Sequence, residues 1–386
     1  MRMLLLLLLS LYMVSSVHAA TLIVDNNGIC DDAIGAPYCN VESAVNAAAI
    51  GDAVEIGSGT YGIYALTTLK SGMTLRGANT DTTVLLIADL ARLYLYKVDN
   101  VEISNLTIIT KPTVYKVSSI TIDYSESIKI IDVSMKLANL PSHGIRVQNS
   151  NVNILRSSID GGQGILVFSA SDIPGILKIT NSSVTNSRTN GITISNNGIA
   201  PREKAEFNNV TISGSSQYGV YIGGSDATLR NSTITNSGKF GLVAVTKSRE
   251  KPLVTISNSI VAGNNLRNYD CGGDTDSIIS LGHNLIGAFC SDSFVEETTD
   301  QYGKLSSPLN PELAPLADNG GTTLTHALLS RSPAIDAGSP IPGFGESCDD
   351  VDQRGLVRPI DGNFDGSNVC DIGAYESGST TPLQCI

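Results

Sequence analysis

The chain has 386 residues and a formal net charge of −12, and 16% of its residues are charged. This acidic balance, together with the lack of a basic run, argues against nucleic acid as a partner. Glycine, serine, threonine and asparagine dominate the polar positions and tryptophan is absent, a composition typical of short strands joined by tight turns.

The first 19 residues are predicted to form a signal peptide. Arg2 precedes an apolar core at residues 4–14, and Val17-His18-Ala19 supplies a small-residue cleavage site. This core is shorter than the roughly 20 apolar residues that a membrane-spanning helix needs, and no other stretch predicts a span. We therefore expect a secreted or surface-associated protein without a membrane span.

The cysteines all follow this predicted cleavage site. Six of them form pairs that are close in the sequence: Cys30 and Cys39, Cys271 and Cys290, and Cys348 and Cys370. Because disulfides form in oxidising compartments, proximity predicts three bridges here. Cys385 is left over and would be either a free thiol or part of an intermolecular bridge.

A short amphipathic helix is predicted from Val41 to Ala49. Asn40 can cap its N-terminus, and residues 41, 44, 45 and 48 share one apolar face. Gly51-Asp52 then turns into an alternating strand at residues 53–56. Such a helix could cover the open end of a stack of strands, which would otherwise present unpaired backbone groups.

From about Gln163 to Gly263 the sequence repeats every 22 to 28 residues. The repeated phrases are marked by asparagines at positions 181, 208, 231 and 258 and by glycines at positions 164, 191, 219 and 241. The intervening segments alternate apolar and polar residues, which is the period of a strand. Repeats of this length without a helical interlude indicate a solenoid.

We therefore predict an all-β fold, a right-handed parallel β-helix over residues 20–264 with an N-terminal capping helix and a loop-rich C-terminal module. The asparagines would form a ladder, and the glycines would permit tight turns between faces. Strand parity places these side chains inward: Ile192, Ile194, Val220, Ile222, Leu242 and Ala244. Thr193, Tyr221 and Val243 should be exposed or covered only by loops.

The N-terminal pattern resembles the pectin-lyase-like β-helix superfamily. The resemblance rests on the capping helix, Gly51-Asp52, Val54-Glu55-Ile56 and Gly59-Thr60-Tyr61, and it spans roughly residues 38–263. It implies the fold but no particular activity.

Residues 265–376 differ in composition and resemble the choice-of-anchor Q domain of exported bacterial proteins. Residues 265–386 carry 18 acidic and 5 basic side chains. The matching blocks are SLGHNLIG at 280–287, PLADNGG at 315–321, THAL at 325–328, SPAIDAG at 332–338, DQRG at 352–355 and CDIGAYE at 370–376. Residues 377–386 are predicted to be a flexible tail that shows no hydrophobic sorting helix, which favours release or loose surface association.

A partial calcium-binding loop occurs near the C-terminus. Asp361, Asn363 and Asp365 stand at relative positions 1, 3 and 5, and glycine follows at position 6. Position 12 is Ile372, although Asp371 stands one place earlier. The alternative is an Asx-rich turn.

The central coils also suggest a ligand-binding surface. His143 and Arg146 begin one coil, and Tyr218 and Tyr221 occupy the corresponding places further along. Rings and cations on a shared face could bind an extracellular polysaccharide or a cell-surface glycan. The alternative is an ordinary mixed, solvated surface.

The sequence favours binding over catalysis. Lyases of the superfamily need clustered calcium-binding carboxylates beside a base, and the related hydrolases need paired carboxylates. Asp160, Asp172 and Asp226 stand isolated in the central coils. We expect a non-catalytic binding or adhesion protein, with a polysaccharide lyase or glycoside hydrolase as the alternative.

Overall fold

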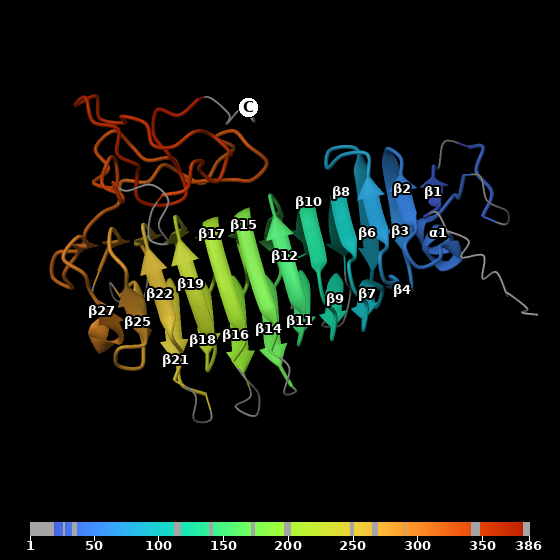
Figure 1. Cartoon of the computed structure of the whole chain (residues 1–386), viewed down its shortest axis with the longest axis horizontal. Coiled ribbons are helices and arrows are strands. Elements are labelled where there is room, and N and C mark those ends of the chain that lie inside the picture. The colour runs from blue at the N-terminus through green and yellow to red at the C-terminus, as the bar shows by residue number, and fades with distance from the viewer. Residues whose placement is uncertain are drawn as a thin grey trace, which may run out of the picture.

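The structure, a computed structural model, describes residues 19–25, 28–32, 37–111, 117–138, 142–170, 174–196, 202–247, 251–264, 269–288, 290–340 and 348–380. The predicted signal peptide up to residue 18, Asp172 and Cys385 lie outside these ranges. The strands stack in parallel into a right-handed β-helix with three faces (Figure 1). The predicted fold class is therefore confirmed.

Two of the three faces are joined in one 19-stranded sheet. The first face holds β1 (Thr21–Val24), β2 (Ala53–Ile56), β5 (Thr74–Gly77), β12 (Asn151–Leu155), β19 (Asp226–Arg230), β22 (Val254–Ser257), β25 (Ile278–Ser280) and β27 (Phe294–Val295). The second face holds β3 (Gly59–Ile63), β6 (Thr83–Ala88), β13 (Ser158–Gly161), β20 (Thr233–Thr235), β23 (Ile260–Val261), β26 (Leu285–Ile286) and β28 (Gln301–Tyr302). Four long strands cross from the first face to the second: β8 (Glu102–Lys111), β10 (Ile128–Leu137), β15 (Ile176–Thr185) and β17 (Lys204–Ser213).

The third face is a separate nine-stranded sheet. Its strands are β4 (Leu66–Thr68), β7 (Arg92–Tyr96), β9 (Ile120–Asp123), β11 (Ile145–Gln148), β14 (Ile165–Ser169), β16 (Ile192–Asn196), β18 (Val220–Gly223), β21 (Leu242–Val245) and β24 (Cys271–Gly273).

From β8 onward, the corner between the first and second faces is made by one residue per coil in the left-handed backbone conformation. The corner column, with φ from 46° to 56°, consists of Asn105, Asp132, Arg156, Asn181, Asn209, Asn231, Asn258 and His283. Asparagine adopts this conformation more readily than most residues. The residue after each corner points inward and the next one lies on the second face, which explains the recurring Asn-x-Ser/Thr triplets.

The corner column differs at one position from the predicted asparagine ladder. Asn209, and not Asn208, occupies the corner, because Thr180 pairs with Asn208 and Asn181 therefore aligns with Asn209. The amides still bond from coil to coil: Asn231 Nδ2 donates to Asn208 Oδ1 (3.1 Å), and Asn258 Nδ2 donates to Asn231 Oδ1 (2.7 Å). The hydrogen-bonded ladder therefore runs through Asn258, Asn231 and Asn208 as predicted, although the left-handed corner residue of that coil is Asn209.

Serines just inside this corner satisfy backbone groups that the bend leaves without a strand partner. Ser157 N donates to Ser182 Oγ (3.1 Å), and Ser232 N donates to Ser259 Oγ (3.1 Å). Each hydroxyl in turn donates to the carbonyl two residues earlier, as Ser182 does to Thr180 O (2.7 Å). The corner is thus hydrogen-bonded internally from coil to coil.

Glycine is required at the corner before the third face because successive coils approach closely there. A Cβ on Gly191 would lie 2.7 Å from Gly219 O, and one on Gly219 would lie 2.6 Å from Gly241 O. Neither residue has a positive φ. These repeat glycines are therefore fixed by the lack of space rather than by backbone conformation.

The predicted inward residues are buried. Six side chains have 0% exposure: Ile192, Ile194, Val220, Ile222, Leu242 and Ala244. Thr193 and Tyr221 are half-buried on the outer surface. Val243 is also on the outer surface, but the prediction that it would be exposed or covered only by loops was wrong. It is 5% exposed and lies between Tyr221 and Gly272 in the register, where the Phe240 ring packs over Gly272.

The N-terminal end is capped by α1 (Val41–Ala47) (Figure 1). Asn40 Oδ1 accepts the N–H of Ser43 (2.7 Å), as predicted for the cap. The helix ends two residues earlier than predicted, because Ala48 is extended and Asp52 accepts the N–H of Ala49 (2.7 Å). No helix in the described part of the chain has the length and apolar character that crossing a membrane requires.

The three predicted disulfides are all formed. They join Cys30 with Cys39, Cys271 with Cys290, and Cys348 with Cys370. The first lies before α1, the second ties β24 to the following loop, and the third lies in the C-terminal part of the chain.

The coils continue past residue 264, where the sequence predicted their end, because β25 to β28 still pair in parallel. The C-terminal segment, residues 303–380, then folds back along the edge of the solenoid above β17, β19 and β22 (Figure 1). It bonds to the second face: Thr211 Oγ1 donates to Gln353 Oε1 (2.6 Å), and Ala374 N donates to Thr233 Oγ1 (3.1 Å).

Apolar packing and buried ion pairs hold this segment in place. Its contact with the coils forms a second, smaller core of Ile260, Ala262, Leu285, Ala334 and Ile372. Inside the segment, Arg354 pairs with Asp352 (2.6 Å) and Arg358 with Glu376 (3.0 Å), and all four side chains are at most 3% exposed. The segment therefore shares a small apolar core with the solenoid.

A buried carboxyl should make stability depend on pH. Burial raises the pKa of Glu203 from 4.5 to about 7, although the N–H of Gly175 and the Ser169 side chain donate to it. Because the pKa is higher in the folded chain, this stabilising term is full below about pH 4.5 and is lost as pH rises to about 7. Its size is on the order of 3 kcal/mol.

We predict that Glu203→Gln will flatten the pH dependence of the free energy of unfolding between about pH 4.5 and 7. Other buried acids such as Asp270, whose pKa burial raises to about 6, titrate alike in both proteins, so their effects cancel in the difference. Denaturant unfolding of variant and wild type across pH 4 to 8 measures the difference in their free energies of unfolding. Parallel curves would show that Glu203 titrates normally.

Candidate functional site

The outer surface of the third face carries aligned columns of side chains. Strand pairing places Tyr94, Thr121, Arg146, Leu166, Thr193, Tyr221 and Val243 in one column. A second column contains Tyr96, Asp123, Gln148 and Phe168. The predicted alignment of Arg146 with Tyr221 is therefore present, and the aromatic and cationic residues gather in two patches along it.

The first patch comprises Arg92, Tyr94, Tyr96, Lys97, Asp123, Tyr124, Arg146, Gln148 and Phe168. The Tyr94 and Tyr96 rings stack at 5.9 Å, and Tyr124 meets Tyr96 edge-on at 6.2 Å. The Arg92 guanidinium lies 5.7 Å from the Tyr94 ring centre, and Lys97 Nζ lies 5.2 Å from that of Tyr96. Cation and ring attract one another in this geometry.

A hydrogen-bonded chain fixes the side chains of this patch. Arg146 Nη1 donates to Asp123 Oδ1 (2.7 Å) and its Nη2 donates to Gln148 Oε1 (2.9 Å). Gln148 Nε2 then donates to the Tyr124 hydroxyl (2.9 Å). The Arg146 guanidinium and the Tyr124 ring are thereby held in place, and such pre-organisation lowers the entropic cost of binding where a ligand binds.

Burial raises the pKa of two side chains in the first patch, Asp123 and Tyr94. Desolvation raises the pKa of Asp123, although Arg146 and a hydrogen bond from Tyr94 oppose the shift. Desolvation, followed by the negative charge of Asp123, raises the pKa of Tyr94. Tyr94 therefore remains protonated at neutral pH, and its hydroxyl donates a hydrogen bond to Asp123.

The second patch comprises Tyr218, Tyr221, Lys239, Phe240, Lys247 and Tyr269. Tyr218 and Phe240 stack in parallel with ring centres 6.1 Å apart, and Tyr269 meets Phe240 edge-on at 6.2 Å. Tyr221 lies 5.8 Å from Tyr218. Lys239 and Lys247 approach the Tyr218 and Tyr221 rings at 5.2 and 6.0 Å.

The predicted ligand residues are thus divided between two patches. Tyr218 and Tyr221 touch each other, whereas Arg146 is three strand steps away, about 14 Å at 4.8 Å per step. His143 is half-buried beside β11, where its carbonyl accepts the N–H of Ser119 (3.1 Å). His143 lies outside both patches, so the four residues do not form one compact site.

Sequence reasoning missed Tyr94, Tyr96 and Tyr124. The signal was present in Arg92-Leu93-Tyr94-Leu95-Tyr96, because inward leucines at alternate positions place arginine and both tyrosines outside. These coils lie before the regular repeat, and only the strand register aligns them with Arg146.

The predicted calcium loop is closed by its own backbone. The Asp361 carboxylate accepts the N–H of Asp365 (3.1 Å) and of Gly366 (2.9 Å), and Asn363 Oδ1 accepts that of Asp365 (2.8 Å). Asp371 is buried and bound elsewhere, since it accepts the N–H groups of Asp336 and Ser377.

These contacts fit an Asx-rich turn, and within the described ranges no three His, Cys, Asp or Glu side chains are grouped as metal ligands. Calcium at Asp361, Asn363 and Asp365 stays a prediction.

Comparison with known proteins supports the fold. Residues 198–293 match a family described as a right handed beta helix region, and no curated protein matches the sequence. The chain is similar in structure to PfbA, a surface adhesin of Streptococcus pneumoniae, at 12% identity and a TM-score of 0.50, over 80% of this chain and 100% of that one.

It is also similar to a PL6 alginate lyase in complex with a trisaccharide, at 15% identity and a TM-score of 0.49, over 72% of this chain and 60% of the lyase. At these identities the likeness shows the β-helix fold alone.

If the loop at residues 361–366 binds calcium, calcium should stabilise the folded chain by about 2.7 kcal/mol at a hundredfold excess over Kd. Asp365→Ala should abolish this gain, whereas Glu296→Ala, at an exposed carboxylate outside the loop, should retain it. Thermal unfolding with calcium and with a chelator provides the test. Coincident wild-type curves would leave only the Asx-rich turn.

Proposed function

We propose that this chain is an extracellular protein that binds an acidic polysaccharide along the third face without cleaving it. The observation that carries the proposal is the pair of aromatic and cationic patches aligned on one outer surface. Aromatic rings offer flat apolar surfaces to sugar rings, and neighbouring cations attract carboxylate or sulfate groups.

Charge supports an acidic ligand. The whole chain has a net charge of −12, yet the patches contain Arg92, Lys97, Lys239 and Lys247 in addition to the paired Arg146 and Asp123. A locally positive strip on an acidic protein orients an approaching polyanion toward that strip. The separation of the patches favours a polymer over a single sugar unit.

A lyase is the second candidate, because Tyr94, Asp123 and Arg146 form one connected group on this face. Elimination needs a base close to the sugar-ring proton. The raised pKa of Tyr94 makes it a poor base at neutral pH, and Asp123 is already engaged by Arg146 at 2.7 Å. We therefore favour binding.

Location outside the cell is part of the proposal. The three disulfides support an oxidising environment. The resemblance of residues 265–376 to the choice-of-anchor Q domain supports association with a cell surface.

Tyr96→Ala is expected to weaken binding of polygalacturonate or alginate oligomers five- to thirtyfold, which corresponds to about 1–2 kcal/mol for a lost ring contact. Tyr96 is 43% exposed, and the matched control Tyr64→Ala removes a ring that is 77% exposed outside both patches. Calorimetric titration measures the affinities. Equal affinities in both variants, or no binding by wild type, would contradict the proposal.

The same samples separate binding from cleavage. A lyase creates a double bond in the uronic acid, which absorbs in the ultraviolet. A steady rise in absorbance that Tyr94→Phe abolishes would establish the lyase instead.

A further inference from the structure

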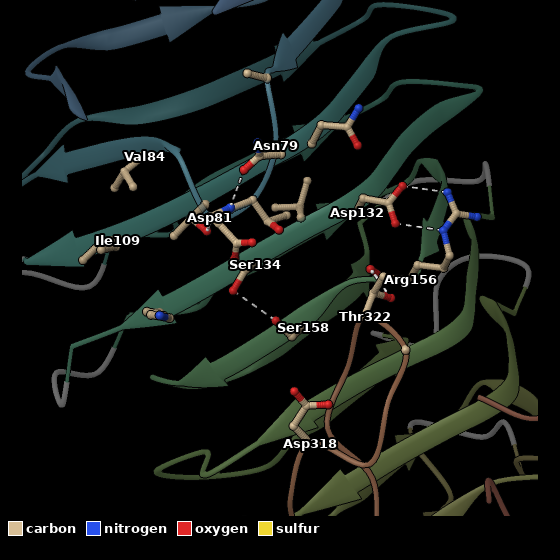
Figure 2. A pocket seen from close by; sticks show the side chains of 17 residues that line it. Asn79, Asp81, Val84, Ile109, Asp132, Ser134, Arg156, Ser158, Asp318 and Thr322 are labelled. Carbon is tan, nitrogen blue, oxygen red and sulfur yellow. Dashed lines mark hydrogen bonds and ion pairs between the residues drawn. The ribbon is translucent and has the colours of Figure 1, made fainter. Parts of the chain in front are cut away.

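A groove of about 760 Å³ lies on the second face, away from both patches (Figure 2). The C-terminal segment lies over the later coils of this face and reaches the corners at Arg156 and Asn181. Residues 318–322 of that segment form one wall, and β6, β8, β10 and β13 form the floor. An adjoining hollow of about 410 Å³ extends it toward β15.

The groove floor is a column of hydroxyl groups. Strand pairing aligns Thr107, Ser134, Ser158 and Ser183, and Ser158 Oγ donates to Ser134 Oγ (3.2 Å) (Figure 2). Ser183 lines the adjoining hollow at 1% exposure, and its hydroxyl has no partner within the described part of the chain.

Where the C-terminal segment covers the second face, the hydroxyls of this column form hydrogen bonds with the segment. The next members of the column, Thr211 and Thr233, are bonded by Gln353 and Ala374 of the C-terminal segment. A buried hydroxyl without a partner is unfavourable. In the open half, Ser134 and Ser158 are partly exposed, and their hydroxyls can exchange further hydrogen bonds with a polar ligand.

The charges in the groove differ from those on the third face. Asp132 and Arg156 neutralise each other through two bonds of 2.7 and 2.8 Å. Asp81 and Asp318 are exposed on opposite walls, as Figure 2 shows. Lys136 on β10 also lines the groove. Asp160 extends the acidic lining of the adjoining hollow. Carboxylates outnumber unpaired cations, so an acidic ligand would be repelled.

We propose that this groove is a second binding site, for a neutral oligosaccharide. Sugar hydroxyls can donate to Asp81 and Asp318 and can exchange hydrogen bonds with Ser134, Ser158 and Thr322. The volume lies in the usual range for ligand sites. The lining contains no aromatic ring, which distinguishes it from the third face and does not favour a flat apolar ligand.

The site depends on the C-terminal segment. Thr322 Oγ1 donates to Arg156 O (3.4 Å) and Thr323 Oγ1 to Asn181 O (3.4 Å), which holds the wall at two corner residues. The chain could then hold a neutral glycan and an acidic one at the same time, on separate faces.

Calorimetric titration with uncharged tetrasaccharides of glucose, mannose and N-acetylglucosamine tests the proposal. Ser158→Tyr would fill the groove from an outward position and should weaken binding at least tenfold. Asn153→Tyr places the same ring on the same coil at an exposed position of the first face, and should bind like wild type. Asp318→Asn, in an exposed turn, should also weaken binding and cannot act by disturbing the coils.

Binding of at least one tetrasaccharide, lost in Ser158→Tyr and weakened in Asp318→Asn, would support the site. The proposal fails if no neutral sugar binds the wild-type chain at millimolar concentration, or if Ser158→Tyr and Asn153→Tyr behave alike. It also fails if Tyr96→Ala removes the binding, or if an uncharged glycine- and serine-rich peptide binds the groove in place of the sugars.

Discussion

The bend of the backbone at the corner column is the constraint on which the rest of the structure depends. One left-handed residue per coil separates the first face from the second, and short polar side chains accept this conformation at the lowest cost. The same residues receive the C-terminal segment: Asn258 O accepts the N–H of Gly373 (2.9 Å), and Asn209 Nδ2 donates to Val351 O (3.0 Å). Coil formation and attachment of the segment therefore use one set of groups.

The corner column changes character where the C-terminal segment stops. Asparagines stand at positions 181, 209, 231 and 258, whereas Asp132 and Arg156 occupy the two preceding corners and pair with each other at 2.7 Å. Asp132 and Arg156 serve as each other's hydrogen-bond partners at this partly exposed position, so neither side chain requires a partner from the C-terminal segment. The second face is thus divided into a docking surface and a groove. The groove and the third face give one solenoid two surfaces of different charge.

The regular elements could be predicted because they depend on local periodicity. Alternation in Gly191-Ile192-Thr193-Ile194 fixes which side chains face inward, and Asn40 fixes the start of α1. What the sequence did not reveal depends on contacts between distant residues. Thr322 meets Arg156 across 166 residues, so the groove has no local signal. The sequence could not decide whether Asn208 or Asn209 occupies the corner, because both fit the repeat spacing. Only strand pairing identifies Asn209 as the corner residue.

The central claim is that a polyanion lies along the third face. Hydroxyl-radical footprinting with and without an acidic polysaccharide tests it directly, because it reports the solvent exposure of individual rings. A polymer bound along this face should reduce the labelling of Tyr94, Tyr96 and Tyr221. Labelling of Tyr64 and Phe364, which are 77% and 88% exposed elsewhere, should not change. Protection of Tyr64 or Phe364 with no change at Tyr94, Tyr96 and Tyr221 would contradict it.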